Sequence, residues 1–145
     1  METRNRVSFS IESIREEKFE LTKGIVTLTQ PLRVMYLIET EINPNNESVY
    51  VRTGIRYKAE EDTICECILG IQFAVDNFSS VVTIDEESRR IHFNGDLMPT
   101  LWGITYGALR GALFEKVKNT FMEPFPLPLI SAEELENMNR FKVVK

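Results

Sequence analysis

The segment from Leu97 to Leu129 constrains the fold most, because it opens with a long helical run that is apolar on nearly every side. No charged residue occurs between Leu97 and Leu109. On a wheel of about 3.6 residues per turn, bulky side chains, smaller side chains and glycines fall into three separate strips. A helix that is apolar all round must be buried all round, yet one sheet of a 145-residue chain covers only one side of it. The sequence therefore predicts that a second subunit covers the other side.

Three glycines at four-residue spacing indicate where this second subunit approaches the helix. A glycine inside a helix costs roughly 1 kcal/mol relative to alanine, so a regular row of glycines favours a groove in which another backbone comes close. The alternative interpretation is a tight contact within the chain. The expected interface residues are Leu101, Gly103, Ile104, Gly107, Ala108 and Gly111. Membrane insertion is not expected, because Arg110 and Glu115 interrupt the apolar run short of the ~20 residues that a bilayer requires.

Charge and composition restrict the class of protein further. With a net charge of -5, the chain lacks the concentrated basic face that sequence-independent binding of nucleic acid requires. The first ten residues, METRNRVSFS, include basic residues, but no apolar segment follows them. We therefore expect neither a secretory signal nor a membrane anchor, and a cytoplasmic location. At 145 residues, a single domain over residues 1–145 is the simplest organisation.

The sequence offers no recognisable catalytic or metal site. Its two cysteines, Cys65 and Cys67, are one residue apart, and His92 is the only histidine, so a zinc site would need two more ligands of the usual kind. No Gly-rich phosphate loop is present, and no nucleophile has a matched base. We therefore expect a protein that is not an enzyme and that uses no metal and no cofactor.

Alternation of apolar and polar residues predicts four strands. They span residues 7–21, 33–43, 49–58 and 64–78, and the first is expected to bend or break near Arg15–Lys18. Two hairpin registers bring apolar residues together on one face and opposite charges together on the other. The expected pairs are Ile38 with Thr53, Tyr36 with Ile55, Glu39 with Arg52, Tyr57 with Cys65, Ile55 with Cys67 and Arg56 with Glu66. Together the strands predict an antiparallel sheet with one apolar face.

The region after the long helix contains its own stop and start signals. Prolines at 124, 126 and 128 end any helix and force an extended link. Ser131 with Glu134 three residues later resembles a capping box, which predicts a short helix to about Met138. Residues 77–96 are the least readable, and within them we expect a solvated loop or short helix at DEESRR, residues 85–90. The fold class is therefore α+β, a four-stranded antiparallel sheet with a long helix packed on one face and a short C-terminal helix.

This order of elements resembles the SecB family of export chaperones. The stretches that carry the resemblance are FSIESI from Phe9, Cys65-Glu66 with Gly70-Ile71-Gln72-Phe73, Leu97-Met98-Pro99, and the segment from Phe121 to Leu135. The resemblance implies a homotetramer, built as a dimer of dimers, that holds unfolded polypeptides in solution without ATP. It implies that clients bind in apolar grooves lined by the loop between the first two strands and by the link between the helices. The client-binding residues implied in this way are Val26, Leu28, Phe121, Met122, Phe125 and Leu127. The alternative is that each is a core or interface side chain.

The sequence alone does not decide which partner the protein binds. Family members that work with the SecA motor carry a flexible C-terminal tail and an acidic outer sheet face, whereas this chain ends soon after its last expected helix, and its outer face mixes acidic with basic residues. Some SecB-like proteins serve instead as dedicated chaperones of toxin–antitoxin systems, with an antitoxin as client. A third possibility is a small-ligand carrier with a pocket between helix and sheet. Its polar lining would have to come from Thr40, Thr53 and the two cysteines.

Overall fold

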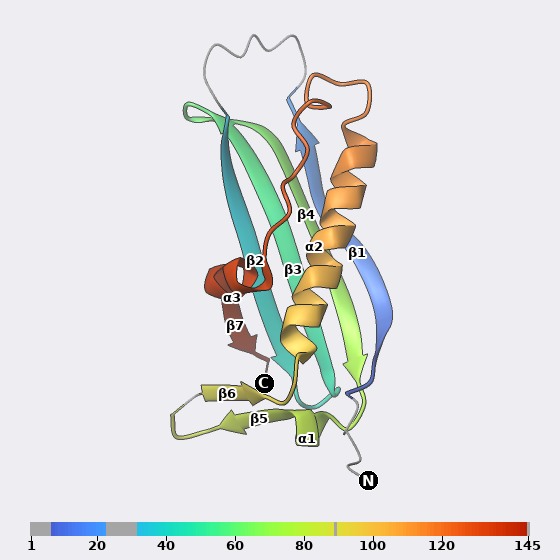
Figure 1. The fold of residues 1–145 in the computed structure, drawn as a ribbon, viewed down its shortest axis with the longest axis vertical. Helices are drawn as coiled ribbons and strands as arrows, with labels where there is room; N and C mark the ends of the chain where they lie inside the picture. The colour runs from blue at the N-terminus through green and yellow to red at the C-terminus, as the bar shows by residue number, and fades with distance from the viewer. Residues whose placement is uncertain (1–6, 23–31, 89, 145) are drawn as a thin grey trace.

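A single mixed sheet with one long helix across it forms the body of the molecule (Figure 1). The computed structural model describes residues 7–22, 32–88 and 90–144. The sheet has five strands in the order β1-β4-β3-β2-β7. These strands are β1 Phe9–Leu21, β2 Arg33–Asn43, β3 Ser48–Ala59, β4 Asp62–Val75 and β7 Asn139–Val143. The helix α2, Leu97–Lys116, lies over one face of this sheet.

The remaining elements lie at the margins of the sheet. A short helix α1, Phe78–Val81, leads into a hairpin of β5 Val82–Asp85 and β6 Arg90–Phe93, which lies beyond the lower end of the sheet in Figure 1. The helix α3, Ala132–Met138, runs directly into β7. None of the helices in the described part of the chain is both long and apolar enough to cross a membrane.

The core lies between α2 and the inner face of the sheet. Alternate residues of the central strands are fully buried there, as Val51, Ile71 and Phe73 show with 0% exposure. The helix contributes a stripe of large side chains, among which Leu101 and Leu109 are 0% exposed. Burial of such side chains stabilises the fold by roughly 1.5–3 kcal/mol each. The apolar side chains at alternate positions of the strands and those of α2 thus pack together in one core.

The predicted strand registers are confirmed. In the β2–β3 pair, Ile38 lies opposite Thr53 and Glu39 opposite Arg52. The β3–β4 pair follows the same expectation, with Arg56 opposite Glu66. The remaining expected pairs, Tyr36–Ile55, Tyr57–Cys65 and Ile55–Cys67, are also present. Register is well specified here because a slip by one residue would move every apolar side chain to the solvent face.

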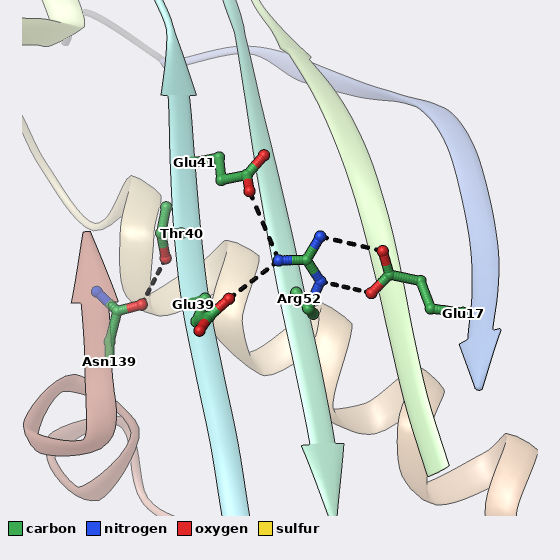
Figure 2. A network of polar contacts seen from close by, with 6 residues as sticks. All are labelled: Glu17, Glu39, Thr40, Glu41, Arg52 and Asn139. Carbon is green, nitrogen blue, oxygen red and sulfur yellow. Dashed lines mark hydrogen bonds and ion pairs between the residues drawn. The ribbon is translucent and has the colours of Figure 1, made fainter. Parts of the chain in front are cut away.

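Ion pairs neutralise the outer face of the sheet. Arg52 on β3 contacts Glu39 at 2.9 Å, Glu41 at 3.5 Å and Glu17 at 3.0 Å, so one guanidinium joins three strands (Figure 2). A second group joins β1, β3 and β4, because Lys18 and Arg56 both contact the buried carboxylate of Glu66. These pairs confirm that the outer face mixes acidic and basic residues.

The expected four-stranded antiparallel sheet requires correction, because the sheet has a fifth strand and is mixed. The strand β7 pairs in parallel with β2, from Ile38 opposite Asn139 to Ile42 opposite Val143. The region that the sequence left unassigned contains α1 and the β5–β6 hairpin, and the described part of DEESRR between these strands, residues 86–88, is a turn. The first strand is continuous over Phe9–Leu21, and its register shifts between Glu16 and Lys18, where a bend or break was expected. Such shifts are bulges, which bend a strand without ending it.

The helix boundaries agree with the sequence. The long helix begins at Leu97, and α3 spans Ala132–Met138 with Ser131 as its N-cap. The hydroxyl of Ser131 accepts a hydrogen bond from the backbone N–H of Glu134 at 3.2 Å. This contact satisfies one of the free N–H groups at the start of α3.

Candidate functional site

The link between α2 and α3 crosses the helix-bearing side of the sheet in an extended conformation (Figure 1). Because its prolines lack a backbone N–H, the link does not form a ladder of its own, and side chains of the body bind its carbonyl groups instead. The hydroxyl of Tyr57 donates to the carbonyl of Phe125 at 3.2 Å, and the hydroxyl of Tyr106 donates to that of Pro128 at 2.6 Å. Nε of Arg110 donates to the carbonyl of Leu127 at 3.2 Å. Three donors from β3 and α2 therefore fix the link.

Both tyrosines remain hydrogen-bond donors at neutral pH. Burial raises the pKa of Tyr57 to about 12, and the neighbouring Tyr36 and Cys65 act in the same direction. Burial also raises the pKa of Tyr106. A protonated hydroxyl is required at both positions, because each one donates to a carbonyl oxygen.

The fixed link buries one of its large apolar side chains and exposes two others. Leu127 is only 4% exposed and packs in the core, whereas Phe125 is 36% exposed and Leu129 is 82% exposed. Phe125 and Leu129 are two residues to either side of the buried Leu127, so the exposure pattern of the link does not follow the side-chain period of two of a regular strand. The link therefore presents large apolar side chains to solvent on a backbone that is held in place.

Apolar grooves flank the link on both sides. The groove towards α2 has a volume of about 360 Å³, and its walls include Phe114, Phe125 and the glycines 107 and 111. The groove towards α3 has a volume of about 410 Å³ and lies between Tyr36 of β2, Leu129 of the link and Met138 of α3. We call these the α2 groove and the α3 groove. Both volumes lie within the range of about 300–1,000 Å³ that is usual for ligand sites.

The expected client-binding residues are divided between surface and core. Phe125 lies on the wall of the α2 groove, and Phe121 is half-buried near the end of α2. Met122, which is 1% exposed, and Leu127 instead anchor the link to the core. Val26 and Leu28 lie outside the described residues.

Leu129 was missed by the sequence interpretation, although it is the most exposed large apolar residue of the described chain. The spacing of the residues between the prolines gave no signal, because a period of two would place Phe125, Leu127 and Leu129 on one side of an extended link. Their exposure depends on how the link lies on the body, which the hydrogen bonds from Tyr57, Tyr106 and Arg110 fix.

The outer side of α2 is the second candidate surface. Gly103, Gly107 and Gly111 are exposed, and a Cβ atom added to any of them would meet no atom within 4 Å. No contact among the described residues therefore explains these glycines, and the tight contact within the chain that was the alternative is absent from this part of the structure. Ile104 and Ala108 are half-buried beside the strip. Leu101, also expected in an interface, is instead fully buried between α2 and the sheet.

Exposed apolar residues on β1 lie on the same side of the sheet as α2. Ile11 and Ile14 pair with Phe73 and Ile71 of β4, and side chains of paired residues share a face of the sheet. Ile11 is 48% exposed and Ile14 is 59% exposed. The helix therefore leaves part of the apolar inner face at β1 uncovered.

Of the two threonines expected to line a ligand pocket, Thr40 is bonded within the protein, whereas the buried hydroxyl of Thr53 has no hydrogen-bond partner among the described residues. The hydroxyl of Thr40 accepts a hydrogen bond from Nε1 of Trp102 at 2.9 Å and donates to Oδ1 of Asn139 at 2.6 Å (Figure 2). Both of its roles are therefore taken by the protein. Burial raises the pKa of Cys65 to about 12 and that of Cys67 to about 11, which keeps both thiols protonated and unreactive.

Comparison with known proteins identifies the fold. No protein-family profile matches the sequence, and no curated protein sequence matches it. Among solved structures, the chain is similar to the Rv1957 SecB-like chaperone of Mycobacterium tuberculosis, solved in complex with a ChAD peptide from the HigA1 antitoxin. The TM-score is 0.54 at 12% sequence identity, over 85% of this chain and 88% of that chain. The chain therefore has a SecB-like fold.

Proposed function

We propose that the protein is an ATP-independent chaperone of the holdase type, which binds unfolded polypeptides along the link between α2 and α3. The observation that carries this proposal is the exposure of Phe125 and Leu129, at 36% and 82%, on a link that three hydrogen bonds hold in place. Exposed apolar side chains normally reduce solubility, and their concentration on a fixed segment is typical of a binding surface. No nucleotide is needed for such binding, because burial of apolar surface drives it.

The geometry supports an extended polypeptide as the ligand. The α2 groove and the α3 groove lie on opposite sides of the same link, and Leu129 on the wall of the α3 groove is almost fully exposed. Side chains of an extended peptide alternate in direction, so successive side chains reach different pockets. Because the link is fixed before binding, little of the binding free energy is lost in ordering it.

The similarity to a peptide-bound SecB-like chaperone supports a peptide ligand. The favoured role is a general holdase that acts in the cytoplasm, and the SecB-like fold makes protein export the proposed context. The bound antitoxin peptide of the Mycobacterium tuberculosis protein favours one alternative, a chaperone dedicated to an antitoxin. Coupling to the SecA motor is the least supported part of this proposal, because Arg52, Arg56 and Lys18 neutralise the outer sheet face.

An aggregation assay with link variants tests the proposal. The protein should suppress aggregation of several unrelated denatured proteins at stoichiometric ratios without nucleotide. Changing Phe125 and Leu129 together to serine should weaken this suppression with little change in melting temperature, because both side chains are exposed. Leu127→Ser is the matched control, since it removes a buried side chain from the same link and should lower the melting temperature.

Three outcomes of this assay distinguish the candidate functions. A double variant that holds clients as well as the parent would show that the link is not the client surface. Protection of one partner only, with no effect on the panel, would identify a dedicated chaperone. No protection of any client would exclude a holdase and leave the small-ligand carrier as the alternative.

We also propose that the chain assembles into a homotetramer, a dimer of dimers, through the outer side of α2. The support comes from the row Gly103, Gly107 and Gly111, which costs the helix roughly 1 kcal/mol at each position without any neighbour within 4 Å. Ile104 and Ala108 border this row, and the uncovered Ile11 and Ile14 add apolar area on the same side of the sheet. A second copy whose helix packs against the glycine row would bury both the row and the uncovered isoleucines of β1.

Gly107→Leu tests the assembly. A Cβ atom at this position meets no atom within 4 Å, and the space beyond it is the open α2 groove, so the fold of the subunit should tolerate a leucine. Light scattering at micromolar concentration should nevertheless show a smaller assembly than the parent, because the leucine occupies the space of the partner helix. Glu136→Leu, at an exposed position of α3, adds the same side chain elsewhere and should leave the mass unchanged. A parent protein with the monomer mass would refute the proposal.

A further inference from the structure

The edge of β2 is occupied along only half of its length. β7 pairs with the segment from Ile38 to Ile42, while β7 has no residue opposite Arg33–Leu37. Tyr36, within that uncovered half, also lines the α3 groove. The edge of β2 is thus continuous with a groove that the proposed function assigns to clients, and β7 lies immediately beyond it (Figure 1).

The surface beneath β7 contacts two side chains of β7, Asn139 and Phe141, which are two residues apart. Oδ1 of Asn139 accepts a hydrogen bond from Thr40 at 2.6 Å. Two residues later, the ring of Phe141 stacks on Phe93 with 5.4 Å between centroids and approaches Trp102 at 6.1 Å. This part of β2 therefore accepts an extended segment that carries a polar amide and, two residues on, an aromatic ring.

β7 pairs over fewer residues than any other strand of the five-stranded sheet. β7 has five residues and pairs in parallel on one side only, whereas β2 and β3 pair over eleven residues. Parallel pairs are slightly less stable per residue than antiparallel pairs. Phe141 remains 43% exposed, and Nδ2 of Asn139 is buried without a hydrogen-bond partner among the described residues. An unpaired buried donor opposes docking, because its hydration is lost without replacement.

We propose that the edge of β2 from Ile38 to Ile42 is a second client site, which β7 occupies in the resting protein. The occupant that replaces β7 is an extended client segment with an aromatic residue, which pairs with the backbone of β2 and places its ring between Phe93 and Trp102. Strand addition of this kind is a general mode of peptide recognition. The inference rests on the proposed holdase function, because it extends the site in the α3 groove along β2.

A reversible lock on β7 tests this exchange in the full-length chain. Glu41 and Lys142 are opposite residues of the parallel β2–β7 pair, and their side chains lie on the outer face. Neighbouring strands are about 4.8 Å apart, within the range that a disulfide spans. The double variant Glu41→Cys with Lys142→Cys should therefore form a disulfide that retains β7. The natural Cys65 and Cys67 are buried on the opposite face and do not compete.

The probe is a fluorescent peptide with the sequence MNRFKVV, which is that of residues 138–144. We expect the reduced double variant to bind this peptide at least about tenfold more tightly than the oxidised one, with binding restored by a reductant. A peptide with serine in place of its phenylalanine should bind at least about tenfold more weakly. Equal binding by the oxidised and reduced proteins, or by neither of them, would overturn the exchange of β7.

The aggregation assay on the same two samples separates this inference from the proposed function. Loss of protection on oxidation, with recovery on reduction, supports a client site under β7. Equal protection by both samples would overturn the second site and leave the link site standing. No protection by either sample would overturn the holdase function itself, whatever the peptide shows. Glu39→Cys with Lys142→Cys, whose positions are not opposite each other, is the matched control and should not respond to the reductant.

Discussion

Replacing Thr40 by valine tests the buried polar contact that joins α2, β2 and β7. Thr40 is 0% exposed, and its hydroxyl is the acceptor for the indole N–H of Trp102 at 2.9 Å. The same hydroxyl donates to Oδ1 of Asn139 at 2.6 Å. Valine keeps the shape of the side chain but leaves the indole N–H, on a residue that is 3% exposed, without an acceptor.

The expected loss follows from these contacts. A buried donor left unpaired costs about 1–3 kcal/mol. The lost hydrogen bond to Asn139 adds about 0.5–1 kcal/mol, at the low end because that residue is only half-buried. The added methyl group returns about 0.8 kcal/mol through burial. The free energy of unfolding should therefore fall by about 2 kcal/mol, which lowers the melting temperature of a domain of this size by about 4–8 °C.

Thr53 provides a matched control on the neighbouring strand. It is 2% exposed on the same face of the sheet, but its hydroxyl has no hydrogen-bond partner among the described residues. Thr53→Val removes an unsatisfied polar group instead of a satisfied one. The free energy of unfolding should therefore stay unchanged or rise by up to about 1 kcal/mol.

Urea unfolding at one fixed protein concentration measures both variants, since assembly makes stability depend on concentration. A second readout comes from Trp102, which is the only tryptophan, so its indole N–H gives one identifiable resonance. Hydrogen exchange at this N–H should accelerate in Thr40→Val and not in Thr53→Val. If Thr53→Val loses as much stability as Thr40→Val, the assignment of the polar contact is wrong.

Two further predictions concern ionisable groups of the sheet. Burial raises the pKa of Glu66, but hydrogen bonds from Lys18 and Arg56 outweigh this effect and hold the pKa below its ordinary value of 4.5. The contribution of Glu66 is therefore present above pH 4.5 and is lost as pH falls through the lowered pKa, so urea unfolding of Glu66→Gln should depend less on pH below about 4.5 than that of the parent. Equal slopes for both proteins would contradict this. Cys65 and Cys67, whose pKa values burial raises to about 12 and about 11, should react with a thiol reagent only after denaturant unfolds the chain. Rapid labelling of the native protein would show that this end of the core opens.

Sequence analysis predicted well the strands whose apolar and charged residues agree with only one pairing register. In β2, β3 and β4 the apolar residues alternate over long stretches, and pairing Glu39 with Arg52 agrees with the burial of Ile38. The two signals are independent, so their agreement fixes the register. The long helix was likewise predictable from its apolar run, which has no charged residue between Leu97 and Leu109.

The fifth strand was missed because its signal is not local. β7 follows α3 without a turn residue, and within it Phe141 stands between Arg140 and Lys142. Its partner, β2, lies far back in the chain, and a parallel pair has no hairpin to indicate its register. The side of the link that faces the core was missed for a similar reason, because the donors Tyr57 and Tyr106 come from distant elements.

Because β7 pairs with β2 from far along the sequence, the ribosome completes β2 well before it makes this partner strand. β2 is complete at Asn43, but its partner begins only at Asn139, about 100 residues later. At ribosomal rates of about 5–20 residues per second, the segment from Ile38 to Ile42 waits about 5–20 s for β7. Throughout that interval the edge of β2 carries unpaired backbone groups that any neighbouring nascent strand can bind. Slower elongation downstream of β4 lengthens the interval and increases the fraction of chains that pair with one another before β7 emerges.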